Sequence, residues 1–186
     1  MTANTSVKVW DIFVRAFHWL LVAAIGFCWF SGKQGGNWME WHMYSGYAVI
    51  ALILLRFIWG LIGSQHARFS AFIYSPKTTF QYAISLFKGQ EKHYLSHNPL
   101  GALGVFLLLG LCLAQAGTGL FATDDIMTDG PLMSWVSYDL SLQLTKLHKL
   151  IFNGLLGVIG LHIAAVLLHQ IFRKERLLQG MITGKK

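Results

Sequence analysis

The sequence predicts an all-α integral membrane protein, a bundle of four transmembrane helices with both ends of the chain in the cytoplasm. Three observations lead to this fold class. Of the 186 residues, 54% are hydrophobic and only 12% are charged, whereas soluble domains usually have about 25% charged residues. The charged residues are clustered, which leaves long apolar stretches between them. The chain also has seven tryptophans, and tryptophan favours the membrane–water boundary, so this content is typical of a membrane protein.

Four apolar stretches are long enough for a transmembrane helix, which needs about 20 residues. They cover residues 12–30, 41–62, 101–121 and 147–172. The glycine-rich run 31–36 ends the first, Pro99 suits the start of the third, and the charged run 173–176 ends the fourth. The shorter and more polar segment 73–87 is expected to form an interfacial helix or a loop. We expect residues 1–186 to form one transmembrane domain.

The basic residues are distributed unevenly between the two sides of the predicted bundle. Twelve of the 15 lysines and arginines fall at the two chain ends or around the connection between the second and third spans. The opposite side has only Lys33, Lys146 and Lys149, together with four aspartates. Because lysine and arginine are enriched in cytoplasmic loops, both termini are expected to be cytoplasmic. This distribution accounts for the formal charge of +7 without a nucleic-acid partner.

Histidines at membrane depth are the candidate functional residues, because ionisable groups are costly there and usually serve a function. His148 and His162 lie 14 residues apart on the fourth span, a rise of about 21 Å and a rotation about 40° short of four turns. Both imidazoles are therefore expected on one face, one near each membrane surface. His18 lies near the inner end of the first span and His42 near the outer end of the second. Depth therefore pairs His18 with His162 and His42 with His148.

Each histidine pair could hold one haem iron, since two neutral imidazoles give a six-coordinate b-type haem suited to electron transfer. No C-x-x-C-H motif is present, so covalent c-type attachment is not expected. His169 competes with His162 for the inner role, but its distance from His148 would be about 31 Å along the helix. We therefore favour His162 as the ligand. Any one of these histidines could instead be an interfacial residue or form hydrogen bonds between helices.

Short motifs across essentially the whole chain match one family. They are Val9-Trp10-Asp11 with Arg15, Phe17-His18-Trp19, Trp41-His42 with Gly46, Arg56 with Trp59-Gly60, His97-Asn98-Pro99 with Gly101, and the His148/His162 pair. In these motifs the chain resembles the bacterial cytochrome b561 and nickel–iron hydrogenase b-type cytochrome family. The resemblance implies a four-helix bundle in the bacterial inner membrane with two non-covalent b haems. It also implies a quinone site near the inner haem and an electron-transfer partner on the periplasmic face.

Arginines near the inner end of the bundle are candidates for binding the haem propionates. Arg15 and Arg56, with Arg68 nearby, could bind these carboxylates in bidentate fashion. Each of them could equally be an ordinary cytoplasmic anchor of a span. On the outer side, only the three lysines at positions 33, 146 and 149 could play the same part.

Polar residues on the inner side are candidates for a quinone site, because a quinone carbonyl needs hydrogen-bond donors at the lipid boundary. His169, His97 and Asn98 are expected near the inner haem, together with Arg15. His66 and His93 do not match the haem ligands; they could shape a quinone pocket, but we favour their interpretation as residues of a solvated loop.

The main functional hypothesis is electron transfer through the two haems, between a membrane quinone pool and a periplasmic redox protein. Such a partner could be a cytochrome c, a hydrogenase or a dehydrogenase. The acidic outer loop 123–140 could dock a basic patch on it, or it could equally be a solvated cap on the bundle. The alternative is an enzyme, a superoxide oxidase acting at the outer haem, but four aspartates oppose the cationic funnel that superoxide would need. A haem-free anchor or transporter is disfavoured, because neither an inverted repeat nor a broken helix is evident.

Overall fold

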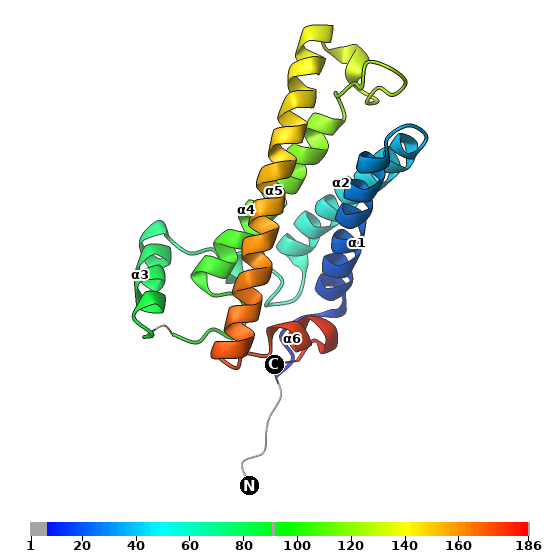
Figure 1. Ribbon diagram of the computed structural model, residues 1–186. Coiled ribbons are helices and arrows are strands. Elements are labelled where there is room, and N and C mark those ends of the chain that lie inside the picture. Colours follow the sequence, from blue (N-terminus) through cyan, green and yellow to red (C-terminus); the bar gives the residue numbers. More distant parts are fainter. Residues whose placement is uncertain (1–6, 91, 186) are drawn as a thin grey trace. The chain divides into compact units, whose positions relative to one another are not determined.

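The computed structural model describes residues 7–90 and 92–185, which form α-helices and short 3₁₀ helices (Figure 1). They are α1 (Ile12–Gln34), α2 (Trp38–Ile62), η1 (Phe69–Ala71), α3 (Pro76–Phe87), α4 (Pro99–Gly119), η2 (Met133–Trp135), α5 (Tyr138–Phe172) and α6 (Leu177–Thr183). Helices α1, α2, α4 and α5 are long and apolar enough to cross a membrane. The predicted all-α class with four spans is therefore confirmed, and the segment 73–87 contains a helix, α3.

The ends of the spans differ from the apolar stretches in the sequence. Helix α1 continues to Gln34 and stops where Gly35 and Gly36 take positive φ angles of 64° and 52°, which glycine adopts without steric cost. Helix α5 begins at Tyr138, nine residues before the expected start, so the predicted outer loop 123–140 ends before Tyr138. Its first two turns are polar, and the hydroxyl of Ser137 accepts a hydrogen bond from the amide of Leu140. Apolarity marks only the membrane-spanning part of this helix.

The described residues form two compact units, each drawn from several segments of the chain. The terminal unit contains the described residues of 1–16, 56–107 and 160–186, and the central unit contains residues 17–55 and 108–159. Helices α1, α2, α4 and α5 each contribute one part to each unit.

The core of the central unit is apolar and takes side chains from all four long helices. Val49 and Ile53 of α2, Cys112 of α4 and Leu155 of α5 are buried together, and Leu21 of α1 packs against them. Many large apolar side chains on the same helices remain exposed, as expected for surfaces that lipid covers. The central unit therefore holds its helices together by apolar packing.

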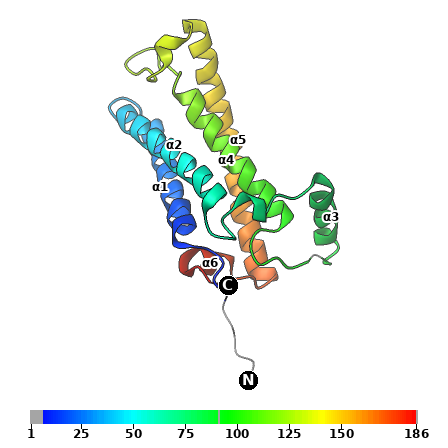
Figure 2. The same cartoon turned by 180° about the vertical axis from the view of Figure 1, so that it is seen from behind.

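The terminal unit joins the two ends of the described chain. The amide of Val9 donates to the carbonyl of Gly184 at 2.8 Å, and Arg15 donates to the carbonyl of Ile182. Gly184 has a φ angle of 83°, and a Cβ there would lie 2.7 Å from the carbonyl oxygen of Trp10. Figures 1 and 2 both show α6 beside the start of α1. The first and last segments of the described residues therefore lie together.

Asp11 connects the start of α1 to the end of α2. Its carboxylate accepts hydrogen bonds from the amide of Val14 at 2.8 Å, from the indole of Trp59 at 2.9 Å and from the hydroxyl of Ser64. Burial raises the pKa of Asp11, but the hydrogen bonds from Ser64, Val14 and Trp59 together outweigh burial and leave it below its usual value. The Asp11 and Trp59 motifs of the sequence thus form one structural contact.

Candidate functional site

His42 of α2 and His148 of α5 face each other within the central unit. Their ring centroids are 6.1 Å apart and the ring planes are inclined by 77°. A metal–imidazole bond is about 2 Å long, so two such bonds plus half a ring on each side span about 6 Å. The separation of the two rings therefore fits the binding of a single metal ion by both.

Both rings are oriented by backbone carbonyl groups of neighbouring helices. The Nδ1 atom of His42 lies 2.8 Å from the carbonyl oxygen of Cys28 in α1, and that of His148 lies 2.8 Å from the carbonyl oxygen of Gln115 in α4. A carbonyl oxygen only accepts hydrogen bonds, so each Nδ1 is assigned the proton. The Nε2 atom of each ring then keeps a lone pair, the arrangement usual for a metal-binding histidine.

Two side chains of α4 also contact the His148 ring. The amide nitrogen of Gln115 lies 2.9 Å from Nε2 and donates to its lone pair, the same lone pair that a metal would bind. The amide oxygen of Gln115 is buried and has no hydrogen-bond partner. The hydroxyl of Thr118 lies 3.2 Å from Nδ1 of His148. Gln115 and Thr118 were not among the candidate residues from the sequence.

Glycines determine how closely the neighbouring helices approach the two rings. A Cβ at Gly32 would lie 3.0 Å from Nδ1 of His42, and a Cβ at Gly119 would lie 3.0 Å from Cε1 of His148. At Gly46 and Gly154 a Cβ would meet nothing within 4 Å, so open space lies beside α2 and α5 there. These positions leave room for a flat group next to the helices.

The predicted inner ligands His18 and His162 belong to different units, His18 to the central unit and His162 to the terminal unit. The ring of His18 makes an edge contact with Trp19, with 5.0 Å between centroids. The side chain of His162 is exposed on α5. Their pairing stays a prediction from depth in the membrane.

Arg56 lies at the end of α2 in the terminal unit and is 3% exposed. It donates to the carbonyl of Ala67 at 3.0 Å, and its guanidinium carbon lies 4.7 Å from the ring centroid of Phe69. A Cβ at Gly60 would overlap the ring of Phe69, so this glycine permits the contact. The Nη1 atom of Arg56 is buried without a hydrogen-bond partner, which leaves a donor for a carboxylate.

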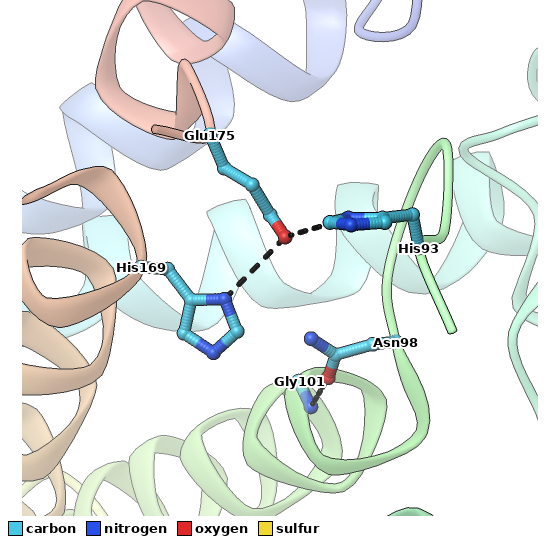
Figure 3. Close-up of polar contacts among 5 residues, drawn as sticks. All are labelled: His93, Asn98, Gly101, His169 and Glu175. Carbon is cyan, nitrogen blue, oxygen red and sulfur yellow. Dashed lines mark hydrogen bonds and ion pairs between the residues drawn. The ribbon is translucent and has the colours of Figure 1, made fainter. Parts of the chain in front are cut away.

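His169 belongs to a polar cluster that also contains Glu175 and His93 (Figure 3). The Nδ1 atoms of His169 and His93 each lie 3.6 Å from the same oxygen, Oε1 of Glu175. Asn98 lies beside them; its side-chain oxygen accepts from the amide of Gly101 at 2.7 Å, and its amide nitrogen is turned toward His169 and Glu175. His93 lies in a loop and is exposed, as expected, but its contact with Glu175 was not predicted.

The ring of His97 lies among aromatic side chains of the terminal unit. Its centroid is 4.7 Å from that of Trp10 and 4.5 Å from that of Phe72. Its carbonyl oxygen accepts a hydrogen bond from the hydroxyl of Tyr74 at 3.0 Å. These contacts hold the turn that leads from His97 into α4.

A family model described as prokaryotic cytochrome b561 matches residues 9–184. The chain belongs to the prokaryotic cytochrome b561 family. It is therefore a multi-pass membrane cytochrome that functions in electron transfer, and the family implies a b-type haem. The resemblance predicted from the sequence motifs is confirmed.

Three curated relatives of this cytochrome are each named a probable Ni/Fe-hydrogenase B-type cytochrome subunit. The protein of Bradyrhizobium diazoefficiens is 20% identical over 78% of this chain, that of Rhodobacter capsulatus 25% over 98%, and that of Rhizobium leguminosarum bv. viciae 24% over 97%. The chain spans only 64% of the Bradyrhizobium protein, against 82% and 89% of the other two. No solved structure matches this cytochrome.

The His42/His148 site fits the b-type haem that the family implies. Two imidazoles with unprotonated Nε2 atoms are the ligands of a low-spin haem iron, and carbonyl groups on the opposite nitrogens are the usual second partners. The iron would take the place of the Gln115 amide at Nε2 of His148. Open space beside Gly46 and Gly154 can accommodate the edge of a macrocycle. Sequence reasoning found the two histidines, but not their backbone partners, because any residue type supplies a carbonyl oxygen.

Proposed function

We propose that this cytochrome holds two non-covalent b haems and transfers electrons across the bacterial inner membrane, between a quinone and a periplasmic redox protein. The proposal places residues 1–186 in one transmembrane domain with both termini in the cytoplasm. The observation that carries it is the His42/His148 pair, whose rings are 6.1 Å apart and whose Nδ1 atoms are both held by carbonyl oxygens.

His42 and His148 are the proposed axial ligands of the outer haem, and His18 and His162 those of the inner haem. The haems supply the one-electron chemistry. The protein orients the imidazoles of His42 and His148, because an Nδ1–H bond to a backbone carbonyl restrains rotation of each ring about its Cβ–Cγ bond. The apolar cluster around Ile53 and Leu155 packs the long helices of the central unit together.

Arg15 and Arg56 are proposed to bind the propionates of the inner haem. The unpartnered Nη1 of Arg56 and the unpartnered Nε of Arg15 supply donors that the backbone contacts of these residues do not use. A guanidinium that is already held by a carbonyl is restricted in its rotamers, so it loses less entropy when it binds a carboxylate.

The quinone is proposed to bind near His169, with Asn98 and His97 as further residues of the site. His169 is the largely buried member of its cluster, with 15% of its side chain exposed. Asn98 uses its oxygen to cap α4, so its amide nitrogen remains a donor for a carbonyl oxygen. A buried imidazole beside a free amide is a suitable pair of donors for a quinone at the lipid boundary.

A hydrogenase is the proposed periplasmic partner, because three relatives are named as B-type cytochrome subunits of Ni/Fe-hydrogenases. A cytochrome c or a dehydrogenase is the competing partner. A pull-down of the tagged cytochrome with the host's membrane fraction and periplasm distinguishes them by the enzyme activity that is retained.

The haem-to-protein ratio of the detergent-purified chain tests the proposed function. We expect two non-covalent haems per chain with sharp low-spin bands after dithionite reduction. His18→Ala and His162→Ala should remove the same haem, and His42→Ala and His148→Ala the other. If His162→Ala kept both haems while His169→Ala lost one, the assignment of the inner ligand would be wrong. A chain without haem would overturn the proposal.

A further inference from the structure

We propose that Glu175 carries protons between a quinone at His169 and the aqueous phase, with His93 as the solvent-exposed end of the path. The inference rests on the proposed quinone site and adds a route for the protons that quinone chemistry needs. It starts from the cluster in Figure 3, in which one carboxylate oxygen lies between two imidazole rings.

The exposure of the three side chains changes steadily along the cluster. His169 is 15% exposed, Glu175 is 24% exposed and His93 is 76% exposed. The carboxylate oxygen is 3.6 Å from a nitrogen on each side. A largely buried imidazole is thus connected to a solvated one through a single carboxylate, which is the order that proton movement to and from water requires.

The turn after α5 determines where the Glu175 side chain lies. The amide nitrogens of Arg173 and Glu175 both donate to the carbonyl oxygen of His169, at 3.0 and 3.3 Å, and the carbonyl of Glu175 accepts from Leu177 at 2.9 Å. Lys174, between them, has a φ angle of 55°, which is uncommon for a residue with a side chain. The backbone therefore turns back at the end of the helix and brings Glu175 next to the ring of His169.

The three groups are suited to transfer protons, because imidazole and carboxylate both exchange a proton with little cost and backbone groups do not. When a quinone takes two electrons from the haems, its two oxygens must also take two protons to give the quinol. For the first proton, Nε2–H of His169 donates to a quinone oxygen and Nδ1 takes a proton from the carboxylic acid of Glu175. Glu175 then takes a proton from the His93 imidazolium, which is reprotonated by water. This transfer leaves the Nδ1–H tautomer of His169, so the ring gives up that proton to water and takes one from water at Nε2 before the same steps deliver the second proton. Quinol oxidation follows the same steps in reverse.

Each gap of 3.6 Å exceeds the usual hydrogen-bond length of about 2.7 to 3.2 Å. A bridging water or a small rotation of the Glu175 side chain closes either gap. Because Glu175 lies on a turn and is partly exposed, both changes are compatible with its surroundings. Rotation of the Glu175 side chain brings its carboxylate close to one histidine and then to the other. The proton is therefore transferred in two separate steps.

Glu175→Gln is the main test, because glutamine keeps the shape of the side chain but cannot carry the proton. The haem-loaded variant is reduced with a stoichiometric amount of dithionite and mixed with a short-chain ubiquinone in weakly buffered detergent solution. Haem absorbance follows electrons and a pH-indicator dye follows proton uptake. We expect both rates to fall about tenfold or more, with unchanged haem spectra and unchanged quinone affinity. Addition of a small weak acid such as imidazole should restore much of the rate.

His93→Asn tests the solvent-exposed end of the path, and His66→Asn is its matched control on another loop of the terminal unit. Because His93 is mostly exposed, this variant should fold normally and lose about two- to fivefold in proton uptake. His66→Asn should behave as the unchanged protein. Proton uptake within twofold of the unchanged protein in both Glu175→Gln and His93→Asn would overturn the path.

A second readout does not depend on turnover. In the reduced, diamagnetic protein, ¹⁵N-histidine NMR should show changed ring-nitrogen shifts for His169 and His93 in Glu175→Gln, while the shifts of His66 stay the same. Unchanged His169 shifts would contradict the contact. If quinone fails to oxidise the haems of the unchanged protein, the proposed quinone site itself is wrong; if it succeeds and Glu175→Gln matches it, only the proton path is wrong.

Discussion

The two histidine sites of this cytochrome differ in the group that faces the Nδ1 atoms. In the central unit, backbone carbonyl oxygens 2.8 Å away accept from His42 and His148. In the terminal unit, a carboxylate oxygen of Glu175 lies 3.6 Å from both His169 and His93. The first arrangement is short and uses the backbone of helices, whereas the second is long and uses a side chain on a turn.

This difference fits the two proposed roles, electron transfer at the first site and proton transfer at the second. A backbone carbonyl cannot take up a proton near neutral pH, so the ring that donates to it keeps one tautomer and one orientation. Such a ring suits a metal ligand, which must move little when the charge of the metal changes. A carboxylate can take the proton, so the ring beside it can change its protonation state. The same residue type is therefore suited to two chemical roles, depending on the group that faces its Nδ1 atom.

The largest expected effect is on cofactor content. His148→Ala should remove one of the two proposed haems, because no other imidazole replaces its Nε2 opposite His42. His169→Ala, in the other site, should keep both haems and lose quinone affinity. Pyridine haemochrome analysis of the purified variants gives the haem content, and equal haem loss in both variants would break the distinction between the two sites.

The next effect concerns the close approach of α4 to the His148 ring. Gly119→Val places a side chain about 3 Å from that ring, and overpacking of this kind costs about 1–3 kcal/mol. We expect partial loss of the outer haem and a lower thermal stability. Gly117→Val is the matched control on the same helix, because a Cβ there meets nothing within 4 Å. Similar haem content in the two variants would show that the ring tolerates displacement.

A smaller effect is expected for the buried arginine of the terminal unit. Arg56→Gln removes the hydrogen bond to Ala67 and the contact with the face of Phe69, at a cost of about 2 kcal/mol. Arg68→Gln, an exposed arginine that donates to the carbonyl of Gly63, should cost less than half as much. Melting temperatures in detergent, followed by the Soret band, compare them. An Arg56 variant as stable as the Arg68 variant would argue against a structural role for the buried guanidinium.

The smallest effect is the pH dependence that Asp11 contributes. Its pKa is lowered in the folded protein, so the unfolded chain binds the proton more readily in acid. The stabilisation is therefore complete above the usual carboxylate range and is lost as the pH falls through the folded pKa. In Asp11→Asn this loss should be absent, so that the stability of the variant declines less below about pH 4. Thermal melts across the acidic range measure the two slopes, and parallel slopes would contradict the assignment.

The sequence predicted the spans because apolar residues are continuous where lipid surrounds a helix. It missed the first turns of α5 because Ser141, Thr145 and their polar neighbours resemble a loop in composition. It placed His42 and His148 together correctly, since their depth and helix face depend only on residue spacing. The pairing of His18 with His162 rests on the same spacing argument and stays a prediction.

Glu175 was not predicted as a functional residue because it lies in a charged run that is typical of the end of a membrane span. Its importance depends on the turn at Lys174, whose positive φ angle returns the chain toward His169. No pattern of residue types distinguishes this turn from an ordinary solvated tail. The backbone partners of His42 and His148 were missed for a similar reason, since every residue has a carbonyl group.

The contact of Val9 and Trp10 with Gly184 has a consequence for biogenesis. The backbone of Val9 and Trp10 is bonded to Gly184, which the ribosome adds long after those two residues have emerged. The segment that contains Val9 and Trp10 therefore lacks its hydrogen-bond partner, Gly184, while the four helices are inserted into the membrane. Fusing a reporter directly after residue 176 would leave this segment unpaired, whereas a fusion beyond residue 185 would let it close. The quality-control proteases of the host would then degrade the first fusion faster than the second.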